Sequence, residues 1–252
     1  MNKRTFFDNE KATLTCMVQG DNPGRIKELM KKSAPQGAEA FGIQFEQMNS
    51  EYRNAEVYKE LFACAEDKPT YVTNYRYNKN EGKSDEQLAD ELLELADCGA
   101  DLCDMMSDYF DKQPGEMTYN ETAVKKQRNL IDKLHKRGAK VLMSTHIQKF
   151  TPADEVLKIA LSHQSRGADI SKIVVGAENM QQQLENLKMI NMLKEKLDVP
   201  FLFLSGGECK ILRRIGGELG CCMYLCVYEY DNFATPLQPL LKKVKAIRDN
   251  MD

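Results

Sequence analysis

A histidine and a lysine occupy matching positions on two neighbouring predicted strands. His146 follows the segment AKVLMST (139–145), and Lys172 lies inside the segment ISKIVV (170–175). Adjacent parallel strands lie only about 4.8 Å apart, so an imidazole and an amine would face the same small space if these two strands pair. An amine can attack a carbonyl carbon and an imidazole can move protons. The pair therefore predicts carbonyl chemistry with the amine as nucleophile.

A lysine inside a strand most often extends its ammonium group outward to solvent, and for an arbitrary strand this would be the better interpretation. Lys172 differs because apolar residues flank it, and desolvation favours the neutral, nucleophilic amine. His146 taken alone would equally fit a loop histidine with a structural hydrogen bond. His163 falls on the apolar face of a predicted helix, and His135 stands near the end of another. We expect packing for the first and solvent exposure for the second.

Strand-like and helix-like segments alternate along the chain. The strands are expected at 12–18, 38–45, 69–75, 100–106, 139–145, 170–175, 199–205 and 221–227. The helices are expected at 25–32, 51–66, 85–97, 121–136, 151–166, 180–197, 209–219 and 237–251. Eight such units in 252 residues predict an α/β fold, a single (β/α)8 TIM barrel domain over residues 1–252 with 1–10 as a lead-in. An open doubly wound sheet is the alternative, but no glycine-rich phosphate-binding sequence follows the first strand.

In such a barrel, functional side chains lie at the C-terminal ends of the strands and in the loops that follow. The polar residues expected there are Gln44, Glu46, Arg76, Asp104, His146, Lys172, Ser205 and the loop 230–238. Arg76 and Arg214 are candidates for holding a carboxylate, because a guanidinium offers two parallel donors. The turn Ser205-Gly206-Gly207 lies where barrels often bind phosphate, although the same residues also suit a tight turn.

The composition argues against a nucleic-acid-binding, membrane-spanning or zinc-binding protein. The 35 basic and 38 acidic residues give a net charge of −3, with both signs interspersed, whereas a nucleic-acid partner requires a basic face. No apolar run is long enough for a signal peptide or a membrane span, which predicts a soluble, cytoplasmic protein. The eight cysteines form no C-x-x-C pair, and with three histidines no zinc site is expected. We interpret the cysteines as small buried hydrophobic residues.

Five segments, in order along most of the chain, resemble the type I 3-dehydroquinate dehydratase family. MSTHIQKFTP is similar to the family's S-N-H-D-F-x-x-T-P and places His146 on its catalytic histidine. GADISKIVV is similar to G-A-D-I-x-K-I-A and places Lys172 on its Schiff-base lysine. RRIGGELG resembles S-R-L-x-G-E-x-F-G and places Arg214 on the arginine that binds the substrate carboxylate. FATPLQ resembles the S-A-P-G-Q lid, and TNYR resembles T-x-R, which place Gln238 and Arg76 on two further substrate-contacting residues.

The chain departs from the family pattern where the substrate hydroxyls are recognised. The family carries Glu-x-Arg-x-Asp on its second strand, and the corresponding residues here are Gln44, Glu46 and Met48. The lid serine is replaced by Ala234, beside which Thr235 offers a hydroxyl. The resemblance thus keeps the pair that activates a carbonyl, together with much of the carboxylate site, and changes the part of the pocket that recognises hydroxyls.

Two further positions that are acidic in the family are not acidic here. The loop after the third strand has Asn80 in register, with Glu81 one residue later, and the fourth strand ends in Met106. The acidic side chains that the family carries at these two positions therefore have no exact counterpart in this sequence.

The resemblance implies a lyase that converts 3-dehydroquinate to 3-dehydroshikimate. Lys172 would form an iminium with the ketone, and His146 would remove the adjacent proton and then protonate the departing hydroxyl. Arg214 and Gln238 would fix the substrate carboxylate. The resemblance implies no metal and no dissociable cofactor.

Two other functions remain open from the sequence. A class I aldolase-type lyase would also carry its lysine on the sixth strand and would bind a phosphorylated substrate at Gly206 and Gly207. A barrel that only binds a metabolite would explain the altered second strand, although it would have no need of a desolvated amine. We expect a small-molecule carboxylate as substrate, no nucleic-acid or membrane partner, and a homodimer, which is the commonest soluble homo-oligomer.

Overall fold

The computed structural model describes residues 5–7 and 10–251. Part of the lead-in expected over residues 1–10 therefore lies outside the described residues. Within it, Phe6 is buried among apolar side chains that include Leu102, Leu142 and Phe201.

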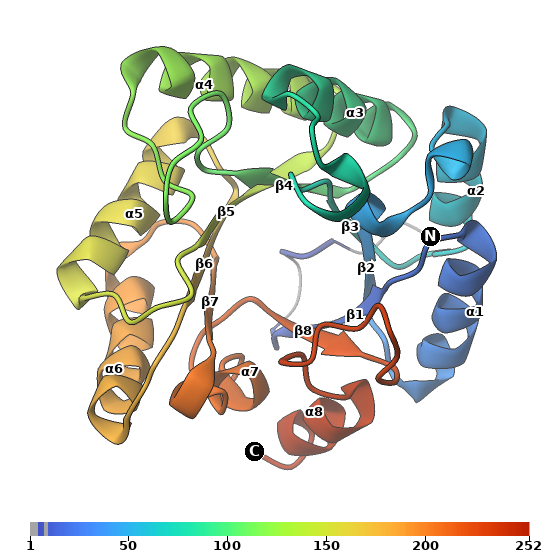
Figure 1. The fold of residues 1–252 in the computed structure, drawn as a ribbon. Helices are drawn as coiled ribbons and strands as arrows, with labels where there is room; N and C mark the ends of the chain where they lie inside the picture. Colours follow the sequence, from blue (N-terminus) through green and yellow to red (C-terminus); the bar gives the residue numbers. More distant parts are fainter. Residues whose placement is uncertain (1–4, 8–9, 252) are drawn as a thin grey trace.

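Eight strands and eight helices alternate along the described chain, in the predicted order (Figure 1). The strands are β1 (Thr13–Val18), β2 (Ala40–Gln44), β3 (Thr70–Thr73), β4 (Leu102–Met106), β5 (Lys140–His146), β6 (Ile170–Val175), β7 (Phe201–Ser205) and β8 (Met223–Val227). The helices are α1 (Pro23–Ser33), α2 (Ala55–Ala63), α3 (Asp85–Asp97), α4 (Glu121–Lys136), α5 (Ala153–Arg166), α6 (Met180–Lys196), α7 (Leu212–Ile215) and α8 (Leu241–Arg248). Shorter 3-10 segments lie at 34–36, 45–47, 50–52, 78–80 and 207–209.

All the strand pairs in the sheet are parallel, and the order is β7-β6-β5-β4-β3-β2-β1-β8. The amide of Cys222 donates to the carbonyl of Phe201 at 2.9 Å, which joins the beginnings of β7 and β8 and nearly closes the sheet. Figure 1 looks along the resulting barrel, with the helices arranged around the strands. The predicted single-domain (β/α)8 barrel is confirmed.

Local sequence explains where most of the helices begin. Asn22 caps α1 by accepting from the amide of Arg25, and Pro23 occupies the first helical position, where its missing N–H costs nothing. Ser84 and Gln87 form a reciprocal capping box at the start of α3. The predicted bounds of α3 and α4 are correct to the residue.

The predicted bounds were least accurate for α2, expected over 51–66, and for the last two helices. The helix expected over 209–219 is reduced to a 3-10 turn and the four-residue α7, because three glycines interrupt the segment that returns to β8. The added Cβ of a residue at Gly216 would lie 2.6 Å from the carbonyl oxygen of Leu212, so this turn requires glycine. The helix expected from 237 begins at Leu241, two residues after Pro239, whose ring prevents the preceding residue from entering a helix.

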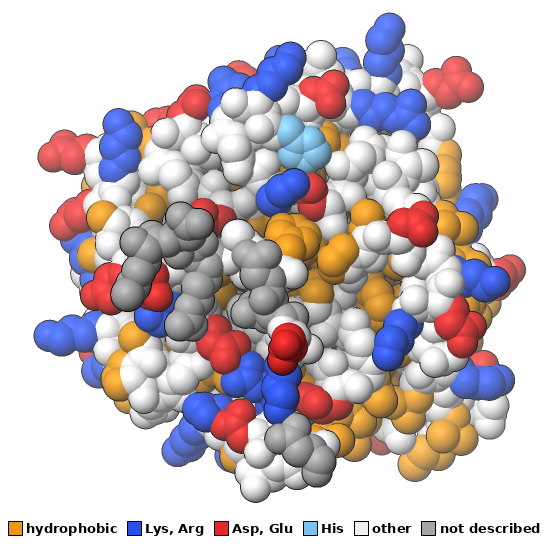
Figure 2. Space-filling view, turned by 180° about the vertical axis from the view of Figure 1, so that it is seen from behind, with side chains coloured by type: hydrophobic (Ala, Val, Ile, Leu, Met, Phe, Trp, Pro, Cys, Tyr) orange, Lys and Arg blue, Asp and Glu red, His pale blue; other side chains and the backbone are white. Residues whose placement is uncertain are grey.

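The surface agrees with the composition, and most of the cysteines are buried. On the face shown in Figure 2, basic and acidic side chains are interspersed. No helix within the described residues is long and apolar enough to cross a membrane. Five cysteines are buried, Cys98 and Cys222 are half-buried, and Cys64 is exposed at the end of α2. The interpretation of the cysteines as buried residues therefore fails for Cys64.

Candidate active site

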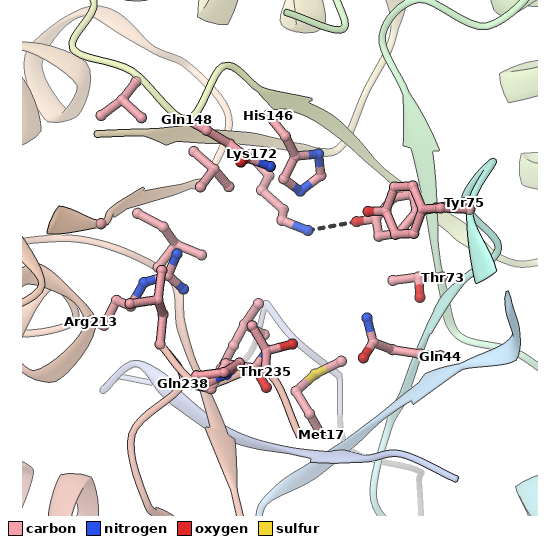
Figure 3. Close-up of a pocket in the computed structure, with 18 of the residues that line it drawn as sticks. Met17, Gln44, Thr73, Tyr75, His146, Gln148, Lys172, Arg213, Thr235 and Gln238 are labelled. Atoms are coloured by element: carbon pink, nitrogen blue, oxygen red, sulfur yellow. Dashed lines mark hydrogen bonds between the residues drawn. The ribbon is translucent and has the colours of Figure 1, made fainter. Parts of the chain in front are cut away.

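A cavity of about 440 Å³ opens at the C-terminal ends of the strands (Figure 3). Its polar lining side chains are Gln44, Tyr71, Thr73, Tyr75, Tyr77, His146, Gln148, Lys172, Arg213, Thr235 and Gln238. Figure 3 shows two sides to it: Arg213 and Gln238 lie on one, and Gln44, Thr73 and Tyr75 lie on the other. Lys172 and His146 extend between these two sides.

The register of two strands brings the predicted histidine and lysine together. β5 pairs with β6 so that Ser144 lies beside Lys172 and His146 beside Val174. Side chains two residues apart on paired strands share a face, so the imidazole and the amine both enter the barrel opening. Lys172 is 4 % exposed, which excludes the solvent-exposed interpretation of this lysine.

The ammonium group of Lys172 lies in a polar cluster rather than in apolar surroundings. Nζ lies 3.0 Å from the hydroxyl of Tyr71, 2.7 Å from that of Tyr75 and 3.0 Å from Oδ2 of Asp104. These three acceptors match the three N–H donors of an ammonium group. The sequence indicated desolvation only, and it did not predict that a buried carboxylate would be the counter-ion.

Asp104 is the fully buried centre of this cluster. Its Oδ2 accepts from Tyr71, Tyr75 and Lys172, and its Oδ1 accepts from Ser144. Burial alone would raise the pKa of Asp104, but the charge of Lys172 and these donors outweigh burial and hold the pKa below its ordinary value. Asp104 is therefore a carboxylate at neutral pH, fixed from every side.

The imidazole of His146 has its own carboxylate partner. Nδ1 lies 2.6 Å from Oε2 of Glu116, in the loop between β4 and α4. A carboxylate at Nδ1 favours the tautomer with hydrogen on that nitrogen and leaves Nε2 for proton transfer. Glu116 adopts a left-handed backbone with φ of 52°, and its carbonyl accepts from the hydroxyl of Ser107. The loop therefore holds this carboxylate in a fixed position.

The structure places Arg213, and not Arg214, in the cavity. Arg213 is 8 % exposed, and its Nε donates to the carbonyl of Ser205 at 3.0 Å. Burial lowers the pKa of this guanidinium to about 10, so it remains charged at neutral pH. No carboxylate pairs with it among residues 5–7 and 10–251. Arg214 is half-buried outside the cavity and donates to the carbonyl of Lys210.

Arg76 is also directed away from the cavity. Its guanidinium binds the carboxylate of Asp85 at 2.6 and 2.8 Å and that of Asp108 at 2.6 Å. Asp85 lies at the start of α3, and Asp108 lies just after β4. The adjacent residues Tyr75 and Tyr77 line the cavity instead.

Two of the three second-strand positions, Gln44 and Glu46, belong to one hydrogen-bonded group. Gln44 lines the cavity and donates to Oε1 of Glu46 at 3.2 Å, and Glu46 also accepts from the hydroxyl of Thr73. Burial raises the pKa of Glu46 to about 7, against the hydrogen bonds that it accepts. Met48 is fully buried in the core. Of the three positions that depart from the family pattern, Gln44 alone appears among the residues that line the cavity.

The segment after β8 covers one edge of the cavity with Thr235 and Gln238. Gln238 is 6 % exposed, and its Oε1 accepts from Nε2 of Gln19 at 3.5 Å. The turn after β7 is built from Gly206 and Gly207, and Gly206 lies beside Leu237 of this segment. The amide of Gly206 donates to the carbonyl of Val175 at 3.1 Å, and Gly207 has φ of 59° with no room for a Cβ beside Ala177. The backbone geometry of the turn is therefore enough to explain its two glycines, and a phosphate site is not needed to account for them.

The other two histidines have structural environments. His163 is fully buried between the hydroxyls of Thr145 and Ser171, and burial lowers its pKa to about 3. His135 is partly exposed and contacts Asp169 at 2.7 Å. Over the described ranges, no group of three or more His, Cys, Asp or Glu side chains is arranged to hold a metal ion.

Sequence reasoning missed four residues of this site, Tyr71, Tyr75, Glu116 and Arg213. Tyr71, Thr73 and Tyr75 stand at every second position along β3 and just beyond its end, and this period of two could have indicated that all three point into the barrel. Arg213 is adjacent to the arginine that was chosen. Glu116 had no such signal, because it lies in the middle of a long loop.

Known proteins that resemble this chain fall largely into one group. A model of the family described as type I 3-dehydroquinase matches residues 15–247. A protein of Alkaliphilus oremlandii named 3-dehydroquinate dehydratase is 36% identical over 93 residues, which are 36% of this chain and 36% of that protein. One of the same name from Lactiplantibacillus plantarum is 29% identical over 126 residues, 48% of this chain and 49% of that protein. The match thus spans less than half of each of these relatives.

Solved structures extend the likeness in fold over nearly the whole chain. The type I 3-dehydroquinate dehydratase of Clostridium difficile, solved with covalently modified comenic acid, superposes with a TM-score of 0.79 at 19% identity, covering 96% of this chain and 92% of that one. The 3-dehydroquinate dehydratase of Geobacillus kaustophilus gives a TM-score of 0.79 at 15% identity, covering 96% and 91%. At such identities the likeness shows the fold.

Proposed function

This chain belongs to the type I 3-dehydroquinase family, and we propose that it dehydrates 3-dehydroquinate to 3-dehydroshikimate through a Schiff base on Lys172. The observation that carries the proposal is that the buried amine of Lys172 and the imidazole of His146 enter one cavity from paired strands. A binding protein would have no use for a buried amine at the wall of its cavity.

The reaction uses these two groups in sequence. The amine of Lys172 adds to the ketone of the substrate, and loss of water gives an iminium that attracts electrons from the neighbouring C–H bond. His146 removes this proton through Nε2 to give an enamine. The imidazolium then protonates the hydroxyl that leaves from the next carbon, and hydrolysis of the imine frees Lys172. The Glu116 carboxylate holds the imidazole in the required tautomer and stabilises the imidazolium.

We assign the substrate carboxylate to Arg213. A buried guanidinium without a carboxylate partner carries a desolvation cost that an anionic ligand would offset. Gln238 and Thr235 lie on the same side of the cavity (Figure 3) and supply neutral donors to that anion. The opposite side, with Gln44 and Thr73, faces the substrate hydroxyls. Arg76 stays in its ion pairs with Asp85 and Asp108, and Arg214 keeps its hydrogen bond to a backbone carbonyl. Neither side chain contacts the substrate.

We further propose that the protein is a cytoplasmic homodimer. The described cysteines are all free thiols, which suits a reducing compartment, and two-fold dimers are the commonest assemblies of soluble proteins. Light scattering during size-exclusion chromatography tests the dimer, and cell fractionation tests the compartment.

The activity is tested by mixing the purified protein with 3-dehydroquinate, following the ultraviolet absorbance of the conjugated enone, and reducing a parallel sample with borohydride for mass spectrometry. We expect turnover together with an adduct on Lys172. An adduct without turnover would keep the Schiff base and require another hydroxy-ketone as substrate. Tight binding with neither signal would contradict the proposal and favour a barrel that only binds its ligand.

A further inference from the structure

We propose that Tyr75 is an additional catalytic residue, whose phenol carries protons between Nζ of Lys172 and the substrate oxygen that is lost as water. The inference rests on the proposed function, because it concerns the steps that form the imine. It adds a residue that the motifs of the sequence did not indicate.

The position of the Tyr75 hydroxyl supports this role. It lies 2.7 Å from Nζ of Lys172 and 2.5 Å from Oδ2 of Asp104. The ring packs edge-on against the imidazole of His146, with 5.3 Å between ring centroids. In Figure 3, the side chain of Lys172 points toward the Tyr75 hydroxyl at the wall of the cavity. Tyr75 thus joins the nucleophile, a buried carboxylate and the general base.

Tyr71 offers a comparison within the same cluster. Its hydroxyl also contacts Lys172, at 3.0 Å, and donates to Asp104. Tyr71 lies inside β3, where it pairs with Gly42 and Leu102 in the adjacent strands, whereas Tyr75 lies beyond the end of β3, beside His146. The two phenols therefore share their polar partners, and Tyr75 is the one next to the residue that handles substrate protons.

The proton balance of imine formation requires such a group. An ammonium and a ketone give an iminium and water, so two protons must travel from nitrogen to the departing oxygen. In the first step, Asp104 accepts one proton, Nζ adds to the carbonyl carbon, and the C=O π electrons move to oxygen. Tyr75 then gives this oxygen its own proton and takes one from nitrogen, which leaves a neutral carbinolamine.

In the second step, the nitrogen lone pair forms the C=N bond while the C–O bond breaks with its electron pair. The oxygen takes the proton that Asp104 stored, passed through the Tyr75 hydroxyl, and departs as water. Both water protons come from the ammonium, and Tyr75 and Asp104 return to their starting states. Burial and the nearby Asp104 charge raise the pKa of Tyr75 well above its ordinary value, so the phenol keeps a proton to give.

The experiment compares Tyr75→Phe with Tyr71→Phe, since each removes one hydroxyl from the same cluster. Enzyme and 3-dehydroquinate are mixed rapidly and quenched with borohydride at increasing times, and the adduct on Lys172 is counted by mass spectrometry. General acid–base catalysis contributes about 10²–10⁴-fold, so we expect Tyr75→Phe to slow adduct formation about 10²-fold. We expect a loss below about 10-fold for Tyr71→Phe, and the same final amount of adduct in both variants.

Replacing Tyr75 with 3-fluorotyrosine provides a second variant that keeps the hydroxyl and its hydrogen bonds, in case Tyr75→Phe does not fold. Because fluorine makes the phenol more acidic, a proton carrier should change the rate of adduct formation, whereas a purely structural phenol should not. Equal losses in the two Phe variants, or an unchanged rate with 3-fluorotyrosine, would overturn the assignment while leaving the Schiff base intact. Failure of the wild-type protein to form any adduct would overturn the proposed function and this inference with it.

Discussion

The carboxylate of Glu116 lies 2.6 Å from Nδ1 of His146, across 30 residues of sequence. The family resemblance predicts an acidic residue in the loop after β3, where this chain has Asn80. That side chain is buried and binds Asn74, Arg53 and the carbonyl of Tyr75. The loop after β4 supplies a carboxylate to the imidazole instead. The carboxylate beside this imidazole thus comes from the next loop of the barrel.

Glu116→Gln should lower kcat about 10- to 10²-fold and leave KM nearly unchanged. The amide has no negative charge to stabilise the imidazolium, and it can present either a donor or an acceptor to Nδ1. Glu116 does not line the cavity, so substrate binding should be little affected. Steady-state kinetics on 3-dehydroquinate measures both constants, with Glu121→Gln at the exposed start of α4 as the control. Equal kcat values for the two variants would refute the role of Glu116.

Lys172→Met should abolish the borohydride adduct and also destabilise the fold. The side chains of Lys172 and Asp104 are both buried, with Nζ 3.0 Å from Oδ2. Removing one member of a buried pair costs about 3–5 kcal/mol, because the other charge is left unpaired. The double variant Lys172→Met, Asp104→Asn should recover part of this free energy of unfolding. Urea denaturation of the single and double variants tests the coupling. Trapping that persists at full stoichiometry in Lys172→Met would disprove the assignment of the nucleophile.

Arg213→Gln should raise KM for 3-dehydroquinate about 10- to 10²-fold, since a hydrogen bond to a charged group contributes about 1.5–3 kcal/mol. Arg214→Gln should change KM less than about twofold, because this side chain donates to a backbone carbonyl outside the cavity. The adjacent arginines are controls for each other. A larger rise in KM for Arg214→Gln than for Arg213→Gln would contradict this assignment and would support Arg214 as the residue that binds the substrate carboxylate.

The fold was readable from the sequence because its signals are local. Each strand is a short apolar run bounded by turn residues, and eight repeats of strand and helix leave few alternatives to a barrel. The pairing of β5 with β6 then follows from chain order, and it was enough to bring His146 and Lys172 together. Predictions failed where a segment is short and rich in glycine, as in α7, because helix periodicity needs more than one turn to be recognised.

The rest of the site depends on contacts that sequence order does not specify. Asp104 and Tyr75 reach Lys172 across the barrel interior, from β4 and from the end of β3, and interior contacts between strands that are not neighbours have no sequence signature. Successive residues on a helix point about 100° apart, so the choice between Arg213 and Arg214 required the orientation of α7. Arg76 matched a motif, but two nearby acids hold it away from the cavity.

Glu46 should make the stability of the protein depend on pH in a direction that can be worked out. Burial raises the pKa of this carboxyl from 4.5 to about 7 in the folded state, so folding favours its neutral form. Below pH 4.5 the carboxyl is neutral in both the folded and the unfolded state, so it does not lower the free energy of unfolding. The cost to stability grows as pH rises from 4.5 to about 7, because the unfolded chain ionises there while the folded protein keeps the proton, and it levels off above pH 7 at about 3 kcal/mol.

Glu46→Gln removes this titration and keeps an acceptor for the hydroxyl of Thr73. The variant should therefore gain about 2–3 kcal/mol of unfolding free energy relative to wild type between pH 5 and pH 8, because the wild type loses that amount over this range. Urea unfolding of both proteins at the two pH values gives the difference directly, and titrations elsewhere cancel in it. Glu56→Gln at an exposed position of α2 controls for the loss of one surface charge. A difference between wild type and Glu46→Gln that stays constant from pH 5 to pH 8 would show that Glu46 is ionised throughout, and that its hydrogen bonds from Thr73 and Gln44 outweigh burial.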